Sequence, residues 1–393
     1  MPTTPSYCSV IRLGSVGLAS MLLACASHAP LPHQSTVAPE SLIAEAPQSL
    51  AQTQVKADEI LATTPEMREF VARHVDLNAR PGQRLEQLIH GMLDEQLLAL
   101  EFELGRTRTA AQTFEDRRGN CLSFTNLFVA LAREAGLLVN YQLIDVPASW
   151  ERNGDWVVVD NHINAILHNL RVDGSHRWNY VVDFNMADFQ GHYPREEIDD
   201  ARAFALFFNN RGAEFMQRGH LEQAHSHLAQ AHALNPRLPA LWLNLGSLYR
   251  KQGQHEQAKS AYLEALRLDP HAPAALSNLA SLYRSLGKTK QALQVERRLS
   301  QLREQDPYYF YQRSLTAYSS GQWLEATRHL DQALRLKKDE HQFIFLRALL
   351  ELQQGQIERA RTSLEQAQSL ASNAQTRALY SSKIHRLSSE SHS

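Results

Sequence analysis

The feature that most restricts the fold of this chain is a repeat with a period of 34 residues in its C-terminal half. Glycines recur at this spacing, and alanines recur at the same spacing five residues after each glycine. Five matches in register at one fixed period indicate a stack of similar structural units. Glycine permits the tight turn inside a helical hairpin, and alanine lets the second helix pack closely on the first. The positions are Gly219, Gly253, Gly287, Gly321 and Gly355, followed by Ala224, Ala258, Ala292, Ala326 and Ala360.

The second unit, PALWLNLGSLYRKQGQHEQAKSAYLEALRLDP, closely resembles the tetratricopeptide repeat. The resemblance implies an all-α solenoid of five hairpins over residues 204–374, and we expect a capping helix and tail at residues 375–393. The third unit departs from the pattern at Glu296 and Leu299 and has extra residues before Pro307, which predicts a longer or shifted second helix. The residues that carry the resemblance are Trp242, Leu245, Gly246, Tyr249, Ala258, Tyr262, Ala265 and Pro270.

Amide side chains also return at the 34-residue period, on the first helix of four hairpins. In tetratricopeptide repeats that helix lines the concave face, and side-chain amides can hydrogen-bond both groups of an extended peptide backbone. The resemblance therefore implies a groove for a peptide or protein partner; the alternative is that these amides are solvated consensus residues. Leu346 ends the series in the fifth hairpin. The series is Asn210, Asn244, Asn278 and Gln312.

The N-terminal residues predict export. An apolar run from Val16 to Ala24 is too short to span a membrane as a mature helix and has the length of a secretory core. The run ends Leu22-Leu23-Ala24-Cys25, which resembles the lipobox of bacterial lipoproteins. This resemblance implies a signal peptide at residues 1–24, a lipid on Cys25, and anchoring at the periplasmic face of the outer membrane; plain secretion is the alternative. Residues 25–55 are rich in Ala, Ser, Pro, Gln and Thr, which predicts a disordered tether.

The charge and cysteine content narrow the choice of function. A formal net charge of -2, with acids and bases interspersed, argues against a nucleic-acid partner. Of the three cysteines, Cys8 lies in the predicted signal and Cys25 is the predicted lipid site. Cys121 then has no partner for an internal disulfide in an oxidising compartment, so it is either a small buried hydrophobe or a chemical group.

The surroundings of Cys121 favour the chemical role. Residues 117–136 have the apolar spacing of a helix that ends at Gly136. Asn120 is the predicted N-cap, which places Cys121 in the first turn. Unpaired backbone amides and the helix dipole there favour a thiolate and can hold an oxyanion. The expected buried face comprises Leu127, Phe128 and Leu131.

Strand-like runs follow this helix, and a turn sequence, Asp173-Gly174, predicts that the last two form a hairpin. If Asp173 and Gly174 are its two loop residues, His162 lies opposite Asn185, and Asp183 falls on the same face of the sheet as His162. Asp160 shares that face and is the rival partner for the imidazole. The runs are residues 138–146, 156–168 and 178–184.

A thiol, a histidine and a carboxylate in this order are the residue types of a nucleophile, a base and the group that orients the base. The motifs that contain them resemble those of the transglutaminase-like superfamily, which is related in architecture to papain-type cysteine proteases. This resemblance implies an α+β domain over residues 56–203, with Cys121 as nucleophile, His162 as general base and Asp183 as the residue that fixes its tautomer. The motifs are GlyAsnCysLeuSer at 119–123, AsnHisIleAsn at 161–164 and ValValAspPhe at 181–184.

The resemblance implies acyl transfer through a thioester on Cys121, with no cofactor. Water as the second nucleophile would make the chain a peptidase or amidase, which we favour, and an amine would make it a cross-linking transglutaminase. A non-enzymatic adaptor or assembly lipoprotein with an inactive front domain is the competing class. Zinc bound by Cys121, His162 and a carboxylate lacks a recognisable fourth ligand. The repeat histidines His225, His227 and His232 are expected to be solvated.

Overall fold

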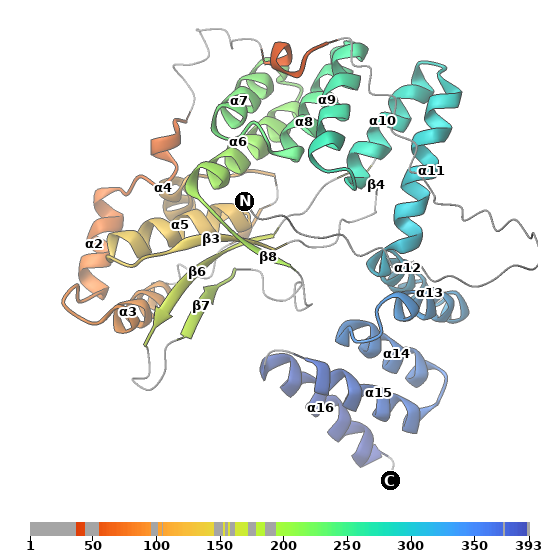
Figure 1. Ribbon diagram of the computed structural model, residues 1–393. Coiled ribbons are helices and arrows are strands. Elements are labelled where there is room, and N and C mark those ends of the chain that lie inside the picture. Colours follow the sequence, from red (N-terminus) through yellow and green to blue (C-terminus); the bar gives the residue numbers. More distant parts are fainter. Residues whose placement is uncertain are drawn as a thin grey trace, which may run out of the picture. The chain divides into compact units, whose positions relative to one another are not determined.

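The computed structural model describes residues 37–43, 55–95, 101–103, 105–144, 152–153, 156–157, 162–171, 178–184, 194–371 and 374–390. Helices and short strands make up the front domain, and helices alone follow from residue 200 onward (Figure 1). This is the predicted order of an α+β domain and an all-α repeat array. The predicted signal peptide and Cys25 lie outside the described residues. No helix in the described ranges combines the length and apolarity that crossing a bilayer requires.

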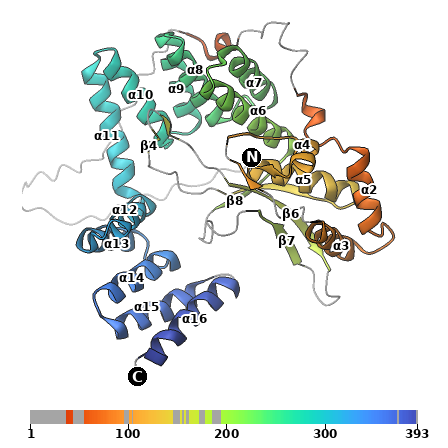
Figure 2. The same cartoon turned by 180° about the vertical axis from the view of Figure 1, so that it is seen from behind.

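Helix α5 (Cys121–Glu134) is the centre of the front domain. Every residue of α5 from Leu122 to Ala132 is buried, so the helix needs cover on all sides. The sheet strand β6 (His162–Leu170) covers one side, and three helices pack against others (Figure 2). The predicted face of Leu127, Phe128 and Leu131 is fully buried, which confirms the prediction. The covering helices are α2 (Pro65–His74), α3 (Pro81–Asp94) and α4 (Ala110–Asp116).

The main sheet is antiparallel, with the strand order β7-β6-β3-β8. In the β6–β7 pair, Ala165 lies opposite Val182 and Ile166 lies opposite Val181. This is the register that a two-residue Asp173-Gly174 loop predicts, although the loop itself lies outside the described residues. A one-residue shift follows further along the pair. The other strands are β3 (Asn140–Ile144), β7 (Trp178–Val182) and β8 (Arg195–Ile198).

The prediction of one strand over residues 156–168 is wrong. Strand β5 (Trp156–Val157) pairs with β4 (Arg152–Asn153) in a separate two-stranded sheet. Strand β6 begins at His162 and pairs with β3 and β7. Both halves of the run have strand composition, but strand preference depends on the neighbours with which a segment pairs, and the pattern does not reveal them.

Five helical hairpins form the repeat array, as predicted. The five periodic glycines have positive φ angles between 69° and 81°, which explains why glycine occupies the turn between the two helices. The five periodic alanines are 0% exposed, so each lies within a helix–helix contact. The pairs are α6 (Asp200–Gln217) with α7 (Leu221–Leu234), α8 (Pro239–Lys251) with α9 (His255–Leu268), α10 (Pro273–Ser285) with α11 (Thr289–Gln305), α12 (Pro307–Ser319) with α13 (Trp323–Leu336), and α14 (His341–Gln353) with α15 (Ile357–Leu370).

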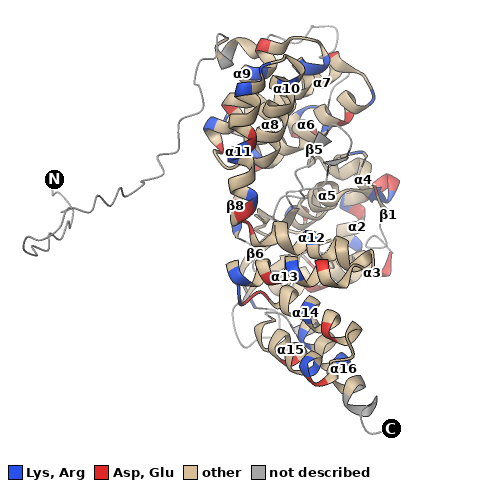
Figure 3. Cartoon of the chain, turned by 90° about the vertical axis from the view of Figure 1, so that its right-hand side faces the viewer, with Lys and Arg blue, Asp and Glu red and all other residues tan. Residues whose placement is uncertain are grey.

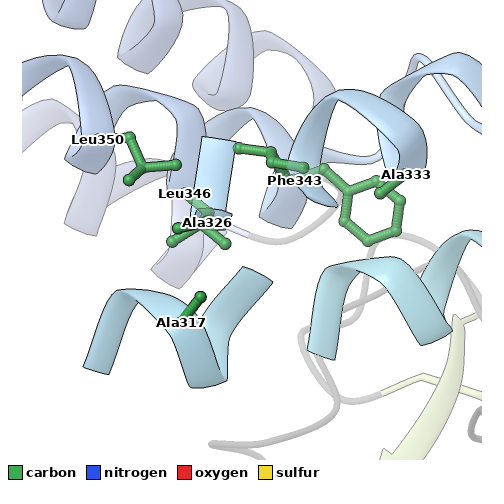
Figure 4. Packing of buried hydrophobic residues seen from close by; sticks show 7 residues of the cluster. Ala317, Ala326, Ala333, Phe343, Leu346 and Leu350 are labelled. Carbon is green, nitrogen blue, oxygen red and sulfur yellow. The ribbon is translucent and has the colours of Figure 1, made fainter. Parts of the chain in front are cut away.

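The core between the fourth and fifth hairpins shows how the repeat packs (Figure 4). Ala326 and Ala333 of α13 belong to one cluster with Ala317 of α12 and Phe343 of α14, and Ala333 lies beside the Phe343 ring. Leu346, which ends the amide series, is 1% exposed and belongs to this core. The fifth hairpin therefore uses that position for packing.

Helix α11 confirms the predicted lengthening of the third repeat, with 17 residues where the other second helices have 14. Helix α16 (Ala374–Glu390) packs on α15 after the last hairpin. The Tyr380 hydroxyl of α16 hydrogen-bonds Nδ1 of the buried His341 at 2.9 Å. Basic and acidic residues are interspersed along the helices (Figure 3), in agreement with the small net charge.

Two predicted boundaries need correction. The expected disordered tether includes residues 37–43, but Pro39–Leu42 forms the 3-10 helix η1, which packs against α9. The expected boundary between residues 203 and 204 falls inside α6, which begins at Asp200. Arg133 at the end of α5 binds both carboxylate oxygens of Asp200, at 2.6 and 2.7 Å. The first helix of the array is therefore fixed to the front domain from its first residue.

Candidate active site

Cys121 is the first residue of α5, as predicted. The side chain of Asn120 caps the helix by accepting a hydrogen bond from the Ser123 amide at 3.0 Å. The Ser123 hydroxyl donates to the same Asn120 oxygen at 2.9 Å. The thiol of Cys121 is half-buried and reduced, so a ligand can reach it at the positive end of a helix dipole.

The segment before Asn120 is held by a short parallel pair of strands. Strand β1 (Glu101–Phe102) lies beside β2 (Arg118–Gly119), and the amide of Glu103 donates to the Gly119 carbonyl at 2.9 Å. Gly119 faces the first turn of α5. A Cβ atom at Gly119 would lie 2.6 Å from Cβ of Ser123, which cannot rotate away. The glycine of the GlyAsnCys motif therefore permits the close approach of this segment to α5.

Gly119→Ala is expected to lower the free energy of unfolding by about 1–3 kcal/mol, the range for an overpacked core site. The backbone must shift to relieve the contact with Ser123, so Cys121 alkylation should slow as well. Denaturant unfolding and thiol labelling measure the two effects. Gly105→Ala is the matched control, because no atom lies within 4 Å of a Cβ at Gly105. Equal stability of the two variants would contradict this account of the motif.

His162 is the first residue of β6, where it lies opposite Ile144 of β3. It is 2% exposed, and its Nε2 hydrogen-bonds Oδ1 of Asp183 at 2.7 Å. The thiol of Cys121 lies close enough to the imidazole to help raise its pKa. The structure thus brings Cys121, His162 and Asp183 together, with a hydrogen bond joining the last two.

Asp183 directly follows β7 and has two fixed partners. Its second oxygen, Oδ2, accepts a hydrogen bond from Asn164 Nδ2 at 3.0 Å. Phe184 packs its ring against Phe124 and Phe128 of α5, with centroid distances of 5.9 and 6.3 Å. Asn164 on the sheet therefore holds the carboxylate directly, and the packing of Phe184 on α5 fixes the backbone next to Asp183.

Asn164 is a site residue that sequence reasoning missed. It is 0% exposed and stands two positions after His162 on the same face of β6. The alternation of a strand could have identified it, since residues i and i+2 face the same neighbours. The rival partner, Asp160, lies outside the described residues.

The electrostatics of the site favour a protonated imidazole. Burial disfavours the imidazolium, but the hydrogen bonds to Asp183 and Cys121 outweigh it and raise the pKa of His162 to about 9. At neutral pH the ring therefore carries a proton and lies beside the thiol and the carboxylate. Nowhere among the residues that the structure describes do three or more His, Cys, Asp or Glu side chains gather closely enough to hold a metal ion.

The first repeat contacts the N-cap of α5 through a buried polar network. The hydroxyl of Thr107 accepts a hydrogen bond from Asn120 Nδ2 at 2.8 Å. The amide of the same Thr107 donates to Oε1 of Glu214, on α6, at 2.5 Å. Arg211 donates to the other Glu214 oxygen at 2.9 Å. Burial raises the pKa of Glu214, while Thr107 and Arg211 oppose the rise. Sequence reasoning missed this connection between the array and the residue beside Cys121.

The predicted amide series is only partly free for a ligand. Asn244 donates to Oδ1 of Asn209 at 2.9 Å, so Asn209 rather than the predicted Asn210 is its neighbour in the first hairpin. Asn278 is buried and donates to the Ser247 hydroxyl at 3.5 Å. Gln312 lines a cavity of about 430 Å³ together with Arg303, Tyr309 and Arg313. Peptide binding by the series stays a prediction.

The expectation that the histidines of the first hairpin are solvated is wrong for His227. It is 4% exposed, packs its ring on Phe215 with a centroid distance of 4.8 Å, and has a pKa lowered to about 4 by burial. His225 and His232 are partly buried, and burial lowers the pKa of each. Periodicity places these residues on α7 but does not distinguish a buried position from an exposed one at the edge of the apolar face.

The fold and the site define a two-part protein: an α+β domain with a Cys-His-Asp site, followed in sequence by a helical repeat array. Residues 72–188 match the family model of the transglutaminase-like superfamily. Residues 237–305, and residues 209–258 with 311–374, match two tetratricopeptide repeat models. The chain therefore carries a transglutaminase-like domain followed by tetratricopeptide repeats.

Solved structures similar to this chain include several tetratricopeptide proteins. YrrB, a TPR protein with an unusual peptide-binding site, is 19% identical, with 46% of this chain and 92% of YrrB covered and a TM-score of 0.24. PilF of Pseudomonas aeruginosa is 19% identical; the match covers 48% of this chain and 94% of PilF, with a TM-score of 0.26. MamA of Desulfovibrio magneticus RS-1 is 17% identical; the match covers 42% of this chain and 94% of the MamA chain, with a TM-score of 0.24. These scores carry no argument about function. No curated protein matches the chain in sequence.

Proposed function

We propose that this chain is a cysteine enzyme that transfers acyl groups from peptide or protein amides through a thioester on Cys121. The observation that carries the proposal is the placing of the Cys121 thiol, at the N-terminus of a buried helix, beside an imidazole that hydrogen-bonds Asp183. A nucleophile, a base and an orienting carboxylate in contact are the parts that thiol-dependent acyl transfer requires.

The geometry supports a proton path in which His162 serves twice. Cys121 gives its thiol proton to His162, its sulfur attacks the amide carbonyl carbon, and the carbonyl electron pair moves to oxygen. Backbone amides at the start of α5 are placed to hold that oxyanion. When the carbon–nitrogen bond breaks, the leaving amine takes the proton from His162, and the acyl group remains on sulfur. Asp183 keeps the ring oriented throughout, because it holds Nε2.

The second nucleophile decides the type of enzyme. Water that loses a proton to His162 would attack the thioester, release a carboxylic acid and restore the thiol. An amine would form a new amide instead. We favour hydrolysis, and hence a peptidase or amidase, because water is present at far higher concentration than any amine at this half-buried thiol.

The repeats supply the binding surface in this proposal, for a protein substrate or a partner. The lipobox resemblance at Cys25 supports a place for the enzyme on the periplasmic face of the outer membrane, held by a lipid. The competing function, a non-enzymatic adaptor or assembly lipoprotein, keeps the repeat surface and the anchor but needs no reactive thiol. The reactivity of Cys121 therefore separates the two functions.

Thiol alkylation across pH tests the proposal. In a chain that begins at Ala26, Cys121 is the single cysteine, so labelling with iodoacetamide reports on it alone. We expect reaction to persist well below the usual thiol pKa of about 8.5 and to slow in His162→Ala. A Cys121 that reacts only at high pH, or equally fast without His162, would overturn the enzyme proposal and leave the adaptor.

A further inference from the structure

The 37–43 segment, which comprises η1 and the residues flanking it, lies on the first two repeats. Its 3-10 helix η1 lies beside α7 and α9 (Figure 1) and contacts α9. Leu42 is 1% exposed, although it belongs to a helix of only four residues. The repeat helices must therefore supply the apolar surface that covers this side chain.

The hydrogen bonds from the repeats reach the backbone of the segment. The hydroxyl of Tyr249 on α8 donates to the Leu42 carbonyl, and Nε2 of His225 on α7 hydrogen-bonds the same Tyr249 hydroxyl at 3.3 Å. The hydroxyl of Ser260 on α9 donates to the Val37 carbonyl at 3.1 Å. Contacts of this kind bind a backbone without reading its side chains. Among the side chains of the segment whose burial the structure describes, Leu42 is the one that is almost fully buried.

The segment has little structure of its own to hold it in place. Within it, the amide and hydroxyl of Ser41 bond the Ala38 carbonyl at 3.1 and 2.7 Å. A single 3-10 turn is too short to be stable by itself in water. Its conformation therefore depends on the surface formed by α7, α8 and α9, as that of a short peptide depends on its receptor.

We propose that the surface made by His225, Tyr249 and Ser260 is a peptide-binding site, and that the 37–43 segment is its resident ligand. The ligand class is a short peptide that buries one aliphatic side chain and presents two backbone carbonyls from a tight turn. This site is distinct from Cys121 and from the amide series, and it does not depend on the proposed enzyme activity.

Because the 37–43 segment belongs to the same chain as its site, it competes with any free peptide that could bind there. A tethered ligand acts at an effective concentration in the millimolar range. A free peptide of similar affinity therefore competes poorly with the segment that is already bound. Loss of the Leu42 anchor should vacate the site and allow a free peptide to enter.

Binding of a labelled peptide with the sequence of residues 35–45, STVAPESLIAE, tests the proposal. We expect the full chain carrying Leu42→Asp to bind this peptide at least tenfold more tightly than the unaltered chain. Tyr249→Phe, added to Leu42→Asp, should weaken binding because a donor to the Leu42 carbonyl is lost. Tyr283→Phe, at the same repeat position one hairpin later, is the matched control and should change nothing.

Fluorescence anisotropy measures binding of the labelled peptide, and far-UV circular dichroism checks that each variant is folded. Equal binding to the Leu42→Asp chain and to the unaltered chain would overturn the proposal, as would binding to neither. Equal losses from Tyr249→Phe and Tyr283→Phe would show that the peptide binds elsewhere. A peptide with aspartate in place of Leu42 should fail to bind, and its binding would contradict the anchor.

Discussion

Asp183→Asn is expected to slow acylation of Cys121 by an activated ester such as p-nitrophenyl acetate by about 10²–10⁴-fold, the usual range for a general base. Asparagine keeps the shape of the side chain and the bond from Asn164 but removes the charge that holds the imidazolium. The burst of nitrophenol in stopped-flow measurements gives the rate. The pH at which activity falls should change too, because the pKa of His162 depends on this carboxylate.

The direction of the pH change follows from the causes of the His162 shift. Burial lowers the pKa of His162, and Asp183 and Cys121 raise it to about 9. With an amide substrate the leaving amine needs the proton on His162, so in an amide-cleavage assay the alkaline limb should lie near pH 9 and move to lower pH in Asp183→Asn. For stability, the protonated ring contributes fully below its ordinary pKa of 6.5, and the contribution is lost as pH rises through about 9.

Asp160→Asn is the matched control for this variant. Asp160 lies on the same predicted face as His162, and it was the alternative partner in the sequence. If Asp183 orients the ring, Asp160→Asn should keep the acylation rate and the position of the alkaline limb. A large loss from Asp160→Asn and a small one from Asp183→Asn would reverse the assignment.

Glu214→Leu should slow Cys121 alkylation at neutral pH by about tenfold or more, although Glu214 lies in the repeat array. The variant leaves the buried amide of Thr107 without its acceptor, which costs about 1–3 kcal/mol. About 1.4 kcal/mol corresponds to tenfold in rate. Thr107 is then free to move away from Asn120, and the cap beside Cys121 loosens.

Leucine suits this position as a helix residue, because Leu248, Leu282 and Leu350 occupy it in other repeats. The helix should therefore remain folded, and circular dichroism checks this. Glu214→Gln keeps an acceptor for Thr107 and should restore much of the rate and the pH profile. The control is Glu296→Gln, which breaks an ion pair with Arg284 in the third hairpin. An alkylation rate and pH profile unchanged in Glu214→Leu would show that Glu214 only stabilises the fold.

Local patterns predicted much of the candidate site. The N-cap at Asn120, the first-turn position of Cys121 and the buried face of α5 follow from spacing within one helix. The part of the β6–β7 pair far from the turn has the register that a two-residue loop predicts, although the register nearer the turn is shifted by one residue, and Asp183 lies beside His162 as predicted. Each of these depends on residues that are close in sequence, where propensity and periodicity carry the information.

The features that were missed join distant residues. Glu214 meets Thr107 across 107 positions, and Tyr249 meets Leu42 across 207. One signal was present in the repeat itself: Glu214 stands where three other hairpins have leucine. Leu350 packs with residues of the preceding repeat, and the first hairpin has no preceding repeat, so a charged residue there indicates a different neighbour. A composition rich in Ala, Ser and Pro gave no comparable sign that residues 37–43 dock.

The attachment of α6 to α5 determines where the repeats of this chain can be replaced by other repeats without disturbing the front domain. Arg133 holds the first residue of α6, and Thr107 holds Glu214 near its end, so α6 is fixed to the front domain at both ends. Replacing the array from residue 209, where the tetratricopeptide match begins, would remove Glu214 and leave the Thr107 amide beside the α5 cap without its acceptor. Exchange after α7 would keep it. The first hairpin is thus the constant part of the array, and the later hairpins are the part whose specificity can be replaced.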